Sequence, residues 1–125
     1  MNWLKCQALR WWCWAACFAR VSYPLLAITE QTLADIRADK VFIGTRAIDI
    51  EEGMTNAFIP ETMTDRAILK IGREVIVLAD HTKCGRVSTV RLAPLSSFQT
   101  LITSQKTPQI FVDAIQKAGL RVIQA

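Results

Sequence analysis

Short apolar runs bounded by polar residues and glycines recur along the chain, and each predicts a β-strand. The clearest runs are residues 40–44 (KVFIG) and 75–79 (VIVLA), and the second predicts a buried strand. Between them, residues 45–59 are mixed in character and contain a glycine, so we predict a loop there. Weaker strand signals lie at residues 88–92, 99–104 and 122–123.

Three segments have the spacing and the terminal residues of amphipathic helices. Residues 30–36 follow Thr29, a candidate N-cap, and residues 60–71 begin with proline and glutamate and stop at a glycine. Residues 108–118 follow Thr107, a second candidate cap, and also stop at a glycine. The side chains predicted to face the core are Leu33, Ile36, Met63, Ala67, Ile68, Ile71, Ile110, Phe111, Ala114, Ile115 and Ala118.

Strands therefore alternate with helices along the chain. This order predicts βαβ units with right-handed crossovers and a mostly parallel sheet with flanking helices, an α/β fold of the Rossmann-like kind. In such sheets, ligands bind at the carboxyl ends of the strands. Two polar clusters follow predicted strands directly, at residues 44–49 (GTRAID) and 80–86 (DHTKCGR). The sequence thus predicts a binding site at this edge of the sheet.

The chain has 125 residues, of which 51% are hydrophobic and 21% charged, as in one globular domain. Its net charge of +4 suggests a nucleic-acid partner. However, Lys5, Arg10 and Arg20 lie among the first twenty residues, which contain no acid. The remainder holds 12 basic and 11 acidic residues without a basic stripe, which argues against DNA binding by the body of the chain.

Residues 1–20 differ from the rest, because they hold all four tryptophans and three of the four cysteines. A secretory signal is disfavoured, since Arg10 interrupts the apolar run and no clean cleavage site follows. The segment is also too short to span a membrane, and Cys13 and Cys17 alone do not make a metal site. A membrane-surface helix and a native apolar segment are alternatives. We favour an aberrant start without selected function.

The cysteines are not spread over the sequence as a disulfide framework would require. Cys84 is the one cysteine outside the first twenty residues. Reduced thiols and a cytoplasmic location are therefore expected.

Several motifs in order resemble the C-terminal effector-sensing domain of DeoR-family transcriptional repressors, over residues 21–125. The family shows an aspartate–lysine phrase of the form D-x-S-K after the central strand. Here the phrase reads Asp80-His81-Thr82-Lys83, and threonine in place of serine keeps the hydroxyl. The other matching stretches are ADKVFIG (38–44), GMT (53–55), ETMTDRAILK (61–70), LSSFQTLITS (95–104) and AGLRVIQA (118–125).

The resemblance implies the fold of ribose-5-phosphate isomerases and glucosamine-6-phosphate deaminases, a sugar isomerase/CoA transferase-like sheet. It implies a phosphorylated sugar or a related metabolite as ligand, and no cofactor. Complete members carry an N-terminal winged helix-turn-helix for DNA, which this sequence lacks, together with the first strand–helix units of the sensor. We therefore expect an incomplete sheet from a truncated gene, a homo-oligomer and no membrane association.

Among the residues after the second strand, Lys83 is the strongest candidate for an anion contact, because an ammonium pairs with phosphate as a point charge. Asp80 is expected to accept hydrogen bonds from sugar hydroxyls, or else to initiate a turn. Thr82 is expected to donate to phosphate, or else to cap the loop. Arg86 is a second cation, for which surface solvation is the simpler interpretation.

Three further ligand-binding candidates follow the first strand. Gly44 allows close approach of the backbone to a ligand, or simply ends the strand. Gly53 is expected in a turn, and Thr55 beside it is a candidate ligand contact.

We predict no catalytic and no metal-binding residue. His81 is the only histidine and has no partner nearby, and Cys84 is more simply an inert thiol than a reactive one. Asp49 follows the first predicted strand, and Glu61 opens the next predicted helix. In the related isomerases, acidic residues after this strand and a glutamate that opens the next helix transfer protons, and Glu61 lies at a corresponding place. Catalysis would need a second polar group and a positioned substrate. A sugar-phosphate isomerase and an inert remnant are the alternatives to a sensor domain.

Overall fold

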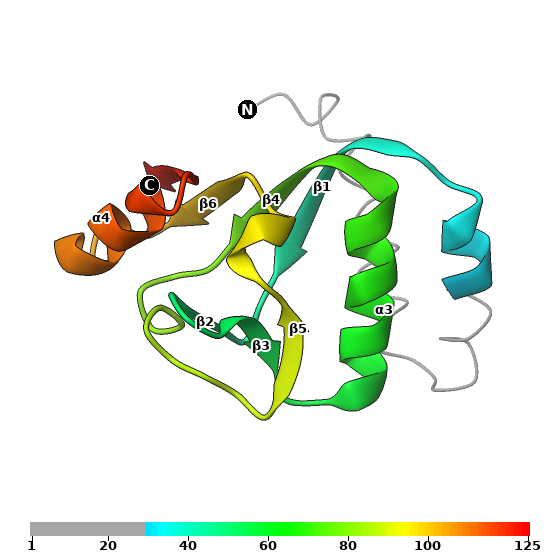
Figure 1. Ribbon diagram of the computed structural model, residues 1–125, viewed down its shortest axis with the longest axis horizontal. Helices are drawn as coiled ribbons and strands as arrows, with labels where there is room; N and C mark the ends of the chain where they lie inside the picture. Colours follow the sequence, from blue (N-terminus) through cyan, green and yellow to red (C-terminus); the bar gives the residue numbers. More distant parts are fainter. Residues whose placement is uncertain (1–29) are drawn as a thin grey trace, which may run out of the picture.

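In the computed structural model, residues 30–125 are described, and they form two sheets and two long helices (Figure 1). The main sheet is parallel throughout, which confirms the predicted α/β class. Residues 30–34 form a short helix, whereas its predicted cap, Thr29, lies outside the described residues. The strands of the main sheet, in spatial order, are β1 (Ala38–Gly44), β4 (Gly72–Leu78), β6 (Thr100–Thr103) and β7 (Arg121–Gln124).

A second, antiparallel sheet replaces most of the loop predicted at residues 45–59, so that prediction was wrong. The strands are too short to show a period of two in the sequence. Asp49 ends the first, and its carboxylate accepts hydrogen bonds from the backbone N–H groups of Glu51 (2.9 Å) and Glu52 (3.2 Å), which closes the turn. The strands are β2 (Ala47–Asp49), β3 (Gly53–Asn56) and β5 (Val90–Ala93).

Helix α3 (Ile59–Ile71) begins and ends close to its predicted limits, with Gly72 as its C-cap. Its buried face is partly different from the prediction, because Thr62 and Thr64 are buried whereas Met63 is exposed. The threonine hydroxyls donate to backbone carbonyls one turn earlier, so their burial leaves no polar group unsatisfied.

Helix α4 (Gln109–Lys117) ends before Gly119, whose φ of 91° suits glycine at this position, as predicted. The cap predicted at Thr107 was wrong, because the Thr107 hydroxyl lies 2.7 Å from the Thr103 hydroxyl and Pro108 takes the cap position. Ile110 was also assigned wrongly to the buried face: it is 85% exposed, in the first turn where no other element covers it. Ala118 and Ile36 are exposed for a similar reason, since each lies beyond its helix.

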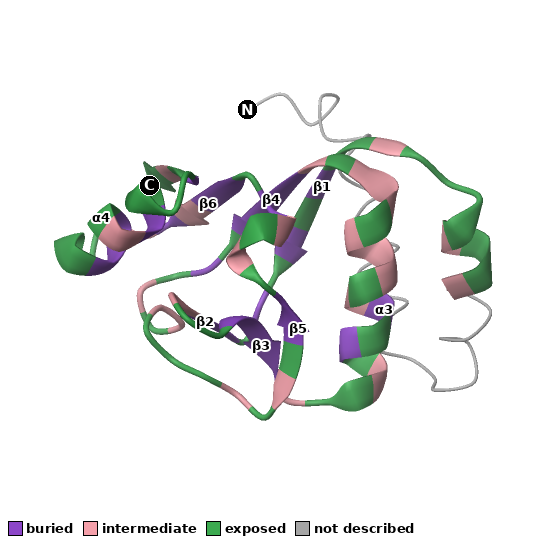
Figure 2. Cartoon of the chain, in the orientation of Figure 1, coloured by how far each residue is buried: buried purple, intermediate pink, exposed green. Residues whose placement is uncertain are grey.

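Most of the buried apolar residues lie on the strands of the two sheets, as the burial colours show (Figure 2). Val41, Val77 and Leu101 of the main sheet pack in one cluster with side chains of the second sheet and of both helices. A single-turn helix, η2 (Leu95–Ser97), leads into Phe98, the largest fully buried side chain. This packing holds the parallel sheet in place. The polar segments at residues 44–49 and 80–86 lie at the carboxyl ends of its strands.

Candidate functional site

Strands β1 and β4 end side by side, with Gly44 paired to Leu78. The two polar segments predicted from the sequence leave the sheet from these strand ends. The structure therefore places Gly44 next to the loop that contains Asp80, Thr82 and Lys83, as expected for a parallel sheet.

The Asp80 carboxylate organises the loop after β4. It accepts hydrogen bonds from the Thr82 backbone N–H (2.8 Å) and from the Thr82 hydroxyl. These bonds, with the Thr82 hydroxyl contributing most, hold the pKa of Asp80 below its usual value. Asp80 is therefore ionised at neutral pH and exposed, with acceptor capacity on its second oxygen.

Lys83 is anchored through its backbone. Its N–H donates to the Asp80 carbonyl (3.1 Å), and its carbonyl accepts from the Ile48 N–H (2.9 Å) in β2. The Gly85 N–H donates to the Ile48 carbonyl (2.8 Å). Within residues 30–125, neither the Lys83 ammonium nor the Arg86 guanidinium has a hydrogen-bond or ion-pair partner. The loop is thus fixed while its cations remain available for an anion.

Two side chains of the same loop attach it to β6. The backbone N–H of His81 donates to the Ser104 hydroxyl (3.1 Å), and the imidazole Nδ1 of His81 lies 3.0 Å from the same oxygen. The Cys84 sulfur lies 3.7 Å from the Thr103 hydroxyl, and burial raises the pKa of its thiol, which disfavours the reactive thiolate. In the part of the chain that is described, no cluster of three or more His, Cys, Asp or Glu side chains could hold a metal ion.

The candidates on β3 are engaged within the protein. Thr55 is buried; its hydroxyl accepts from the Ser88 N–H (2.7 Å), and its carbonyl accepts from the Thr45 hydroxyl (3.2 Å). Gly53 has a φ of 75°, and a Cβ there would lie 2.5 Å from the Ala93 carbonyl oxygen, so glycine is needed for β3 to approach β5. Gly44 differs, because a Cβ there would meet only the Leu78 carbonyl, at 4.0 Å.

A polar network beside β3 was not predicted from the sequence. Asn56 accepts a hydrogen bond from the Arg46 N–H (3.2 Å) and donates one to the Asp65 carboxylate (2.7 Å). The pKa of Asp65 is raised from 3.8 to about 6, chiefly by burial; the hydrogen bond from Asn56 opposes this rise, and the nearby Glu61 carboxylate adds to it. The signal available in the sequence was an aspartate inside an amphipathic helix, preceded by Thr62 and Thr64.

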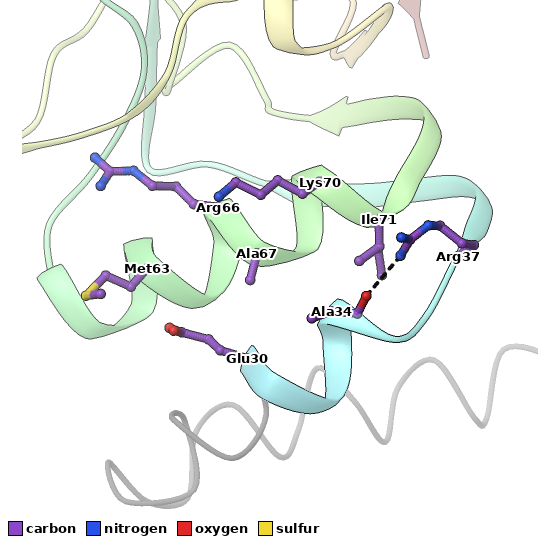
Figure 3. Close-up of a pocket in the computed structure, with 8 residues that line it drawn as sticks. All are labelled: Glu30, Ala34, Arg37, Met63, Arg66, Ala67, Lys70 and Ile71. Atoms are coloured by element: carbon purple, nitrogen blue, oxygen red, sulfur yellow. Dashed lines mark hydrogen bonds between the residues drawn. The ribbon is translucent and has the colours of Figure 1, made fainter.

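A shallow pocket of about 350 Å³ lies at the carboxyl ends of β4, β6 and β7. Among the predicted site residues, Asp80 lines it, whereas Gly44, Thr82 and Lys83 do not; the rest of its wall is formed by Leu78, Ala79, Ile102, Thr103, Ser104 and Ala125. A larger groove of about 570 Å³ lies elsewhere, between the helix at residues 30–34 and α3 (Figure 3). The guanidinium groups beside this groove, of Arg37 and Arg66, already donate to backbone carbonyls. Lys70 also lines this groove. We take the strand ends as the candidate site because the two predicted polar segments leave the sheet there.

Comparison with known proteins identifies the family to which this domain belongs. The family model described as the DeoR C terminal sensor domain matches residues 25–105. The chain is 33% identical to the HTH-type transcriptional regulator GolR of Listeria innocua, over 81% of this chain and 40% of that protein. It is 32% identical to the HTH-type transcriptional repressor GlcR of Bacillus subtilis, over 74% of this chain and 36% of that protein.

A third relative is the glycerol-3-phosphate regulon repressor of Haemophilus influenzae, 27% identical over 76% of this chain and 37% of that protein. The parallel sheet and its covering helices define an α/β domain. The chain belongs to the family of DeoR C-terminal sensor domains, as its motifs predicted. It spans about 40% or less of the length of these relatives.

Within residues 30–125, no helix combines the length and the apolar character needed to cross a membrane.

Proposed function

We propose that the chain is the effector-sensing part of a DeoR-type transcriptional repressor, and that its effector is a phosphorylated sugar or a related metabolite. The observation that carries this proposal is Lys83, whose backbone is held by Asp80 and Ile48 while its ammonium has no partner within the described residues. A fixed cation at the carboxyl end of a parallel strand suits a phosphate. The name of the glycerol-3-phosphate regulon repressor supports a phosphorylated effector.

The binding mode follows from the loop. Lys83 contacts the phosphate, and the exposed oxygen of Asp80 accepts from a hydroxyl of the ligand. Thr82 orients Asp80 through its hydrogen bonds and lies on the same exposed turn, where it is placed to donate to the phosphate. Gly44 leaves room beside the strand end for the ligand to approach.

The two candidates on β3 act less directly in this proposal. Gly53 allows β3 to approach β5 within the second sheet, and the Thr55 carbonyl ties β3 to Thr45 in the segment after β1. Their contribution to ligand binding is to keep Gly44 and the Asp80 loop in register.

In the whole repressor, effector binding favours one arrangement of the sensor over another, and this changes the affinity for DNA of a winged helix-turn-helix outside this sequence. The HTH-type names of the relatives support a DNA-binding module in those proteins. We place the protein in the cytoplasm as a homo-oligomer, without cofactor or metal and without membrane attachment.

We also propose that the chain is not an enzyme. The relatives are named as transcriptional regulators. A sugar-phosphate isomerase needs a general acid and a general base facing one substrate. Asp49 is engaged in its own turn, Asp65 in its contact with Asn56, and Glu61 is exposed at the start of α3. The raised pKa of Asp65 is therefore explained by burial in a structural contact.

Calorimetric titration tests the proposal. The chain is titrated with glycerol-3-phosphate, with pentose and hexose phosphates, with the matching unphosphorylated compounds and with inorganic phosphate. We expect at least one phosphorylated compound to bind more tightly than both its unphosphorylated form and inorganic phosphate. Absence of saturable binding by every compound supports an inert remnant instead, and interconversion of aldose and ketose phosphates supports an isomerase.

A further inference from the structure

The strand-end pocket contains a serine that the sequence did not single out. Ser104 follows β6, is partly exposed, and lines the pocket together with Asp80. Its hydroxyl oxygen is also the point at which the loop after β4 meets β6. The backbone N–H of His81 donates to this oxygen (3.1 Å), and the imidazole Nδ1 of His81 lies 3.0 Å from it.

The hydrogen-bonding capacity of the Ser104 hydroxyl depends on the imidazole. A serine hydroxyl has one hydrogen to donate and two lone pairs that accept, and the His81 N–H occupies one lone pair. When Nδ1 carries no proton, the hydroxyl donates its hydrogen to Nδ1, and a lone pair remains for the pocket. When Nδ1 is protonated, it donates to the second lone pair, and the hydroxyl hydrogen is free. Protonation of His81 therefore decides whether Ser104 offers the pocket an acceptor or a donor.

A phosphate requires the donor form, because its oxygens accept hydrogen bonds. A phosphate is also negatively charged, and a negative charge near an imidazole favours the protonated, cationic form. We propose that Ser104 donates a hydrogen bond to the phosphate of the effector, and that His81 takes up a proton from solvent when the phosphate binds. The proposal rests on the function proposed above and adds one contact and one proton to it.

The neighbouring groups leave the imidazole as the side chain that ordinarily changes its charge near neutral pH. The hydrogen bonds from Thr82 lower the pKa of Asp80, which stays ionised, and burial raises the pKa of the Cys84 thiol, which stays protonated. The side chains that β6 and the residue after it present to the loop are the hydroxyls of Thr103 and Ser104. The other charged groups belong to classes that ordinarily keep their charge in this range: Lys83 on the same loop, Lys106 after β6, and the main-chain carboxylate of Ala125, the last residue of this sequence.

A purely structural role is the alternative for this pair. In that case, the imidazole only fastens the loop after β4 to β6, and ligand binding leaves its protonation unchanged. The bond from the backbone N–H of His81 to Ser104 already fastens the loop without the imidazole, however. The position of Ser104 in the pocket wall also favours a ligand contact.

The chain contains one histidine, so NMR signals of the imidazole report the state of His81 without overlap. The untagged chain, with isotope-labelled histidine, is titrated from about pH 5 to about pH 9 at constant ionic strength. The titration is repeated with saturating glycerol-3-phosphate, with pentose and hexose phosphates, and with the matching unphosphorylated compounds. We expect the phosphate that binds most tightly in calorimetry to move the midpoint of the imidazole titration to higher pH by about 0.5–1 unit. The unphosphorylated compounds should leave the midpoint in place.

Three variants separate the contact from the proton. Ser104→Ala removes the donor, so it should reduce the midpoint change and weaken binding of the phosphate by about tenfold. Ser104→Thr keeps the hydroxyl and should retain both properties. His81→Asn keeps a hydrogen-bonding group near the position of Nδ1 but cannot ionise. The ratio of wild-type to His81→Asn affinity should therefore increase about threefold or more from about pH 8 to about pH 6.

Ser96→Ala is the matched control, because this exposed serine lies in η2 and does not line the pocket. Its midpoint change and its affinity should equal those of wild type. Binding in calorimetry without any change in the imidazole titration would overturn this proposal and leave the proposed function standing. An unchanged affinity in Ser104→Ala would overturn the serine contact. Absence of binding by every phosphorylated compound would overturn the proposed function and this proposal together.

Discussion

The side-chain amide of Asn56 in β3 donates a 2.7 Å hydrogen bond to the carboxylate of Asp65 in α3. The carbonyl oxygen of the same amide accepts from the N–H of Arg46, just after β1. One asparagine therefore joins the first strand, the second sheet and the helix. Because Asp65 is partly buried at this junction, its negative charge opposes folding.

We predict that stability decreases with rising pH through this group. Burial raises the pKa of Asp65 from 3.8 to about 6, so the folded chain binds a proton more tightly than the unfolded chain. Its contribution to the free energy of unfolding is therefore present below pH 4 and is lost as the pH rises to about 6. After allowance for partial solvent access, the loss should be about 1–2 kcal/mol. Urea denaturation across this pH range measures it.

Asp65→Asn isolates the effect, because asparagine keeps an acceptor oxygen for Asn56 but cannot ionise. The variant should be more stable than wild type at pH 7, and the difference should vanish at the acidic end of the range. Asp113→Asn is the control, since this exposed carboxylate contacts only Gln109 on its own helix. Equal differences at all pH values would contradict the assignment to Asp65.

Replacement by alanine should lower the free energy of unfolding by different amounts at Gly53 and at Gly44. Gly53→Ala forces a residue with a side chain into a φ of 75° and brings its Cβ within 2.5 Å of the Ala93 carbonyl oxygen. Strain and overpacking together should lower the free energy of unfolding by about 2–4 kcal/mol. Gly44→Ala meets no close atom, so its effect should stay within about 1 kcal/mol. Thermal denaturation of both variants measures the two losses of stability. Equal losses would contradict the distinction drawn between Gly53 and Gly44.

The main sheet could be predicted from the sequence because its strands are continuous apolar runs, as in Val75 to Leu78. The second sheet could not. Ile48 and Met54 are fully buried, but they lie in strands of three and four residues among threonines and acids. β3 pairs with β5, which lies more than thirty residues away, and β2 pairs in turn with β3. No local sequence pattern reports the distant pairing.

The position of the candidate site could be predicted from the sequence, but the contacts of its residues could not. A polar loop after a buried strand indicated the position of Asp80 and Lys83, since parallel strand ends share an edge. The partners were not predictable. His81 meets Ser104, which is 23 positions away in the sequence, only because β4 and β6 are neighbours. Likewise, Asn56 meets Asp65 only because α3 packs back onto β3.

Two phenylalanines provide a test of the core. Phe98 is 1% exposed and belongs to the central cluster, so Phe98→Ala should lower the free energy of unfolding by about 3–5 kcal/mol. Phe58, before α3, is 60% exposed, and Phe58→Ala should cost less than about 1 kcal/mol. Chemical denaturation measures both. A small effect at Phe98 would mean that the packing around η2 differs from that described, and a large effect at Phe58 would mean that this side chain is buried rather than exposed.

The proposed effector site makes a prediction about two cations of one loop. Lys83 is half buried and fixed through Asp80 and Ile48, whereas Arg86 is exposed and lies beyond the Gly85 turn. If Lys83 contacts the phosphate, Lys83→Ala removes a charge-assisted contact of about 1.5–3 kcal/mol, and affinity should fall roughly ten- to hundredfold. Arg86→Ala should change the affinity far less, because a solvated cation contributes little. Calorimetric titration of wild type and both variants with the tightest-binding sugar phosphate measures the ratio. Unchanged affinity in Lys83→Ala would show that this loop is only a polar turn and that the phosphate binds elsewhere.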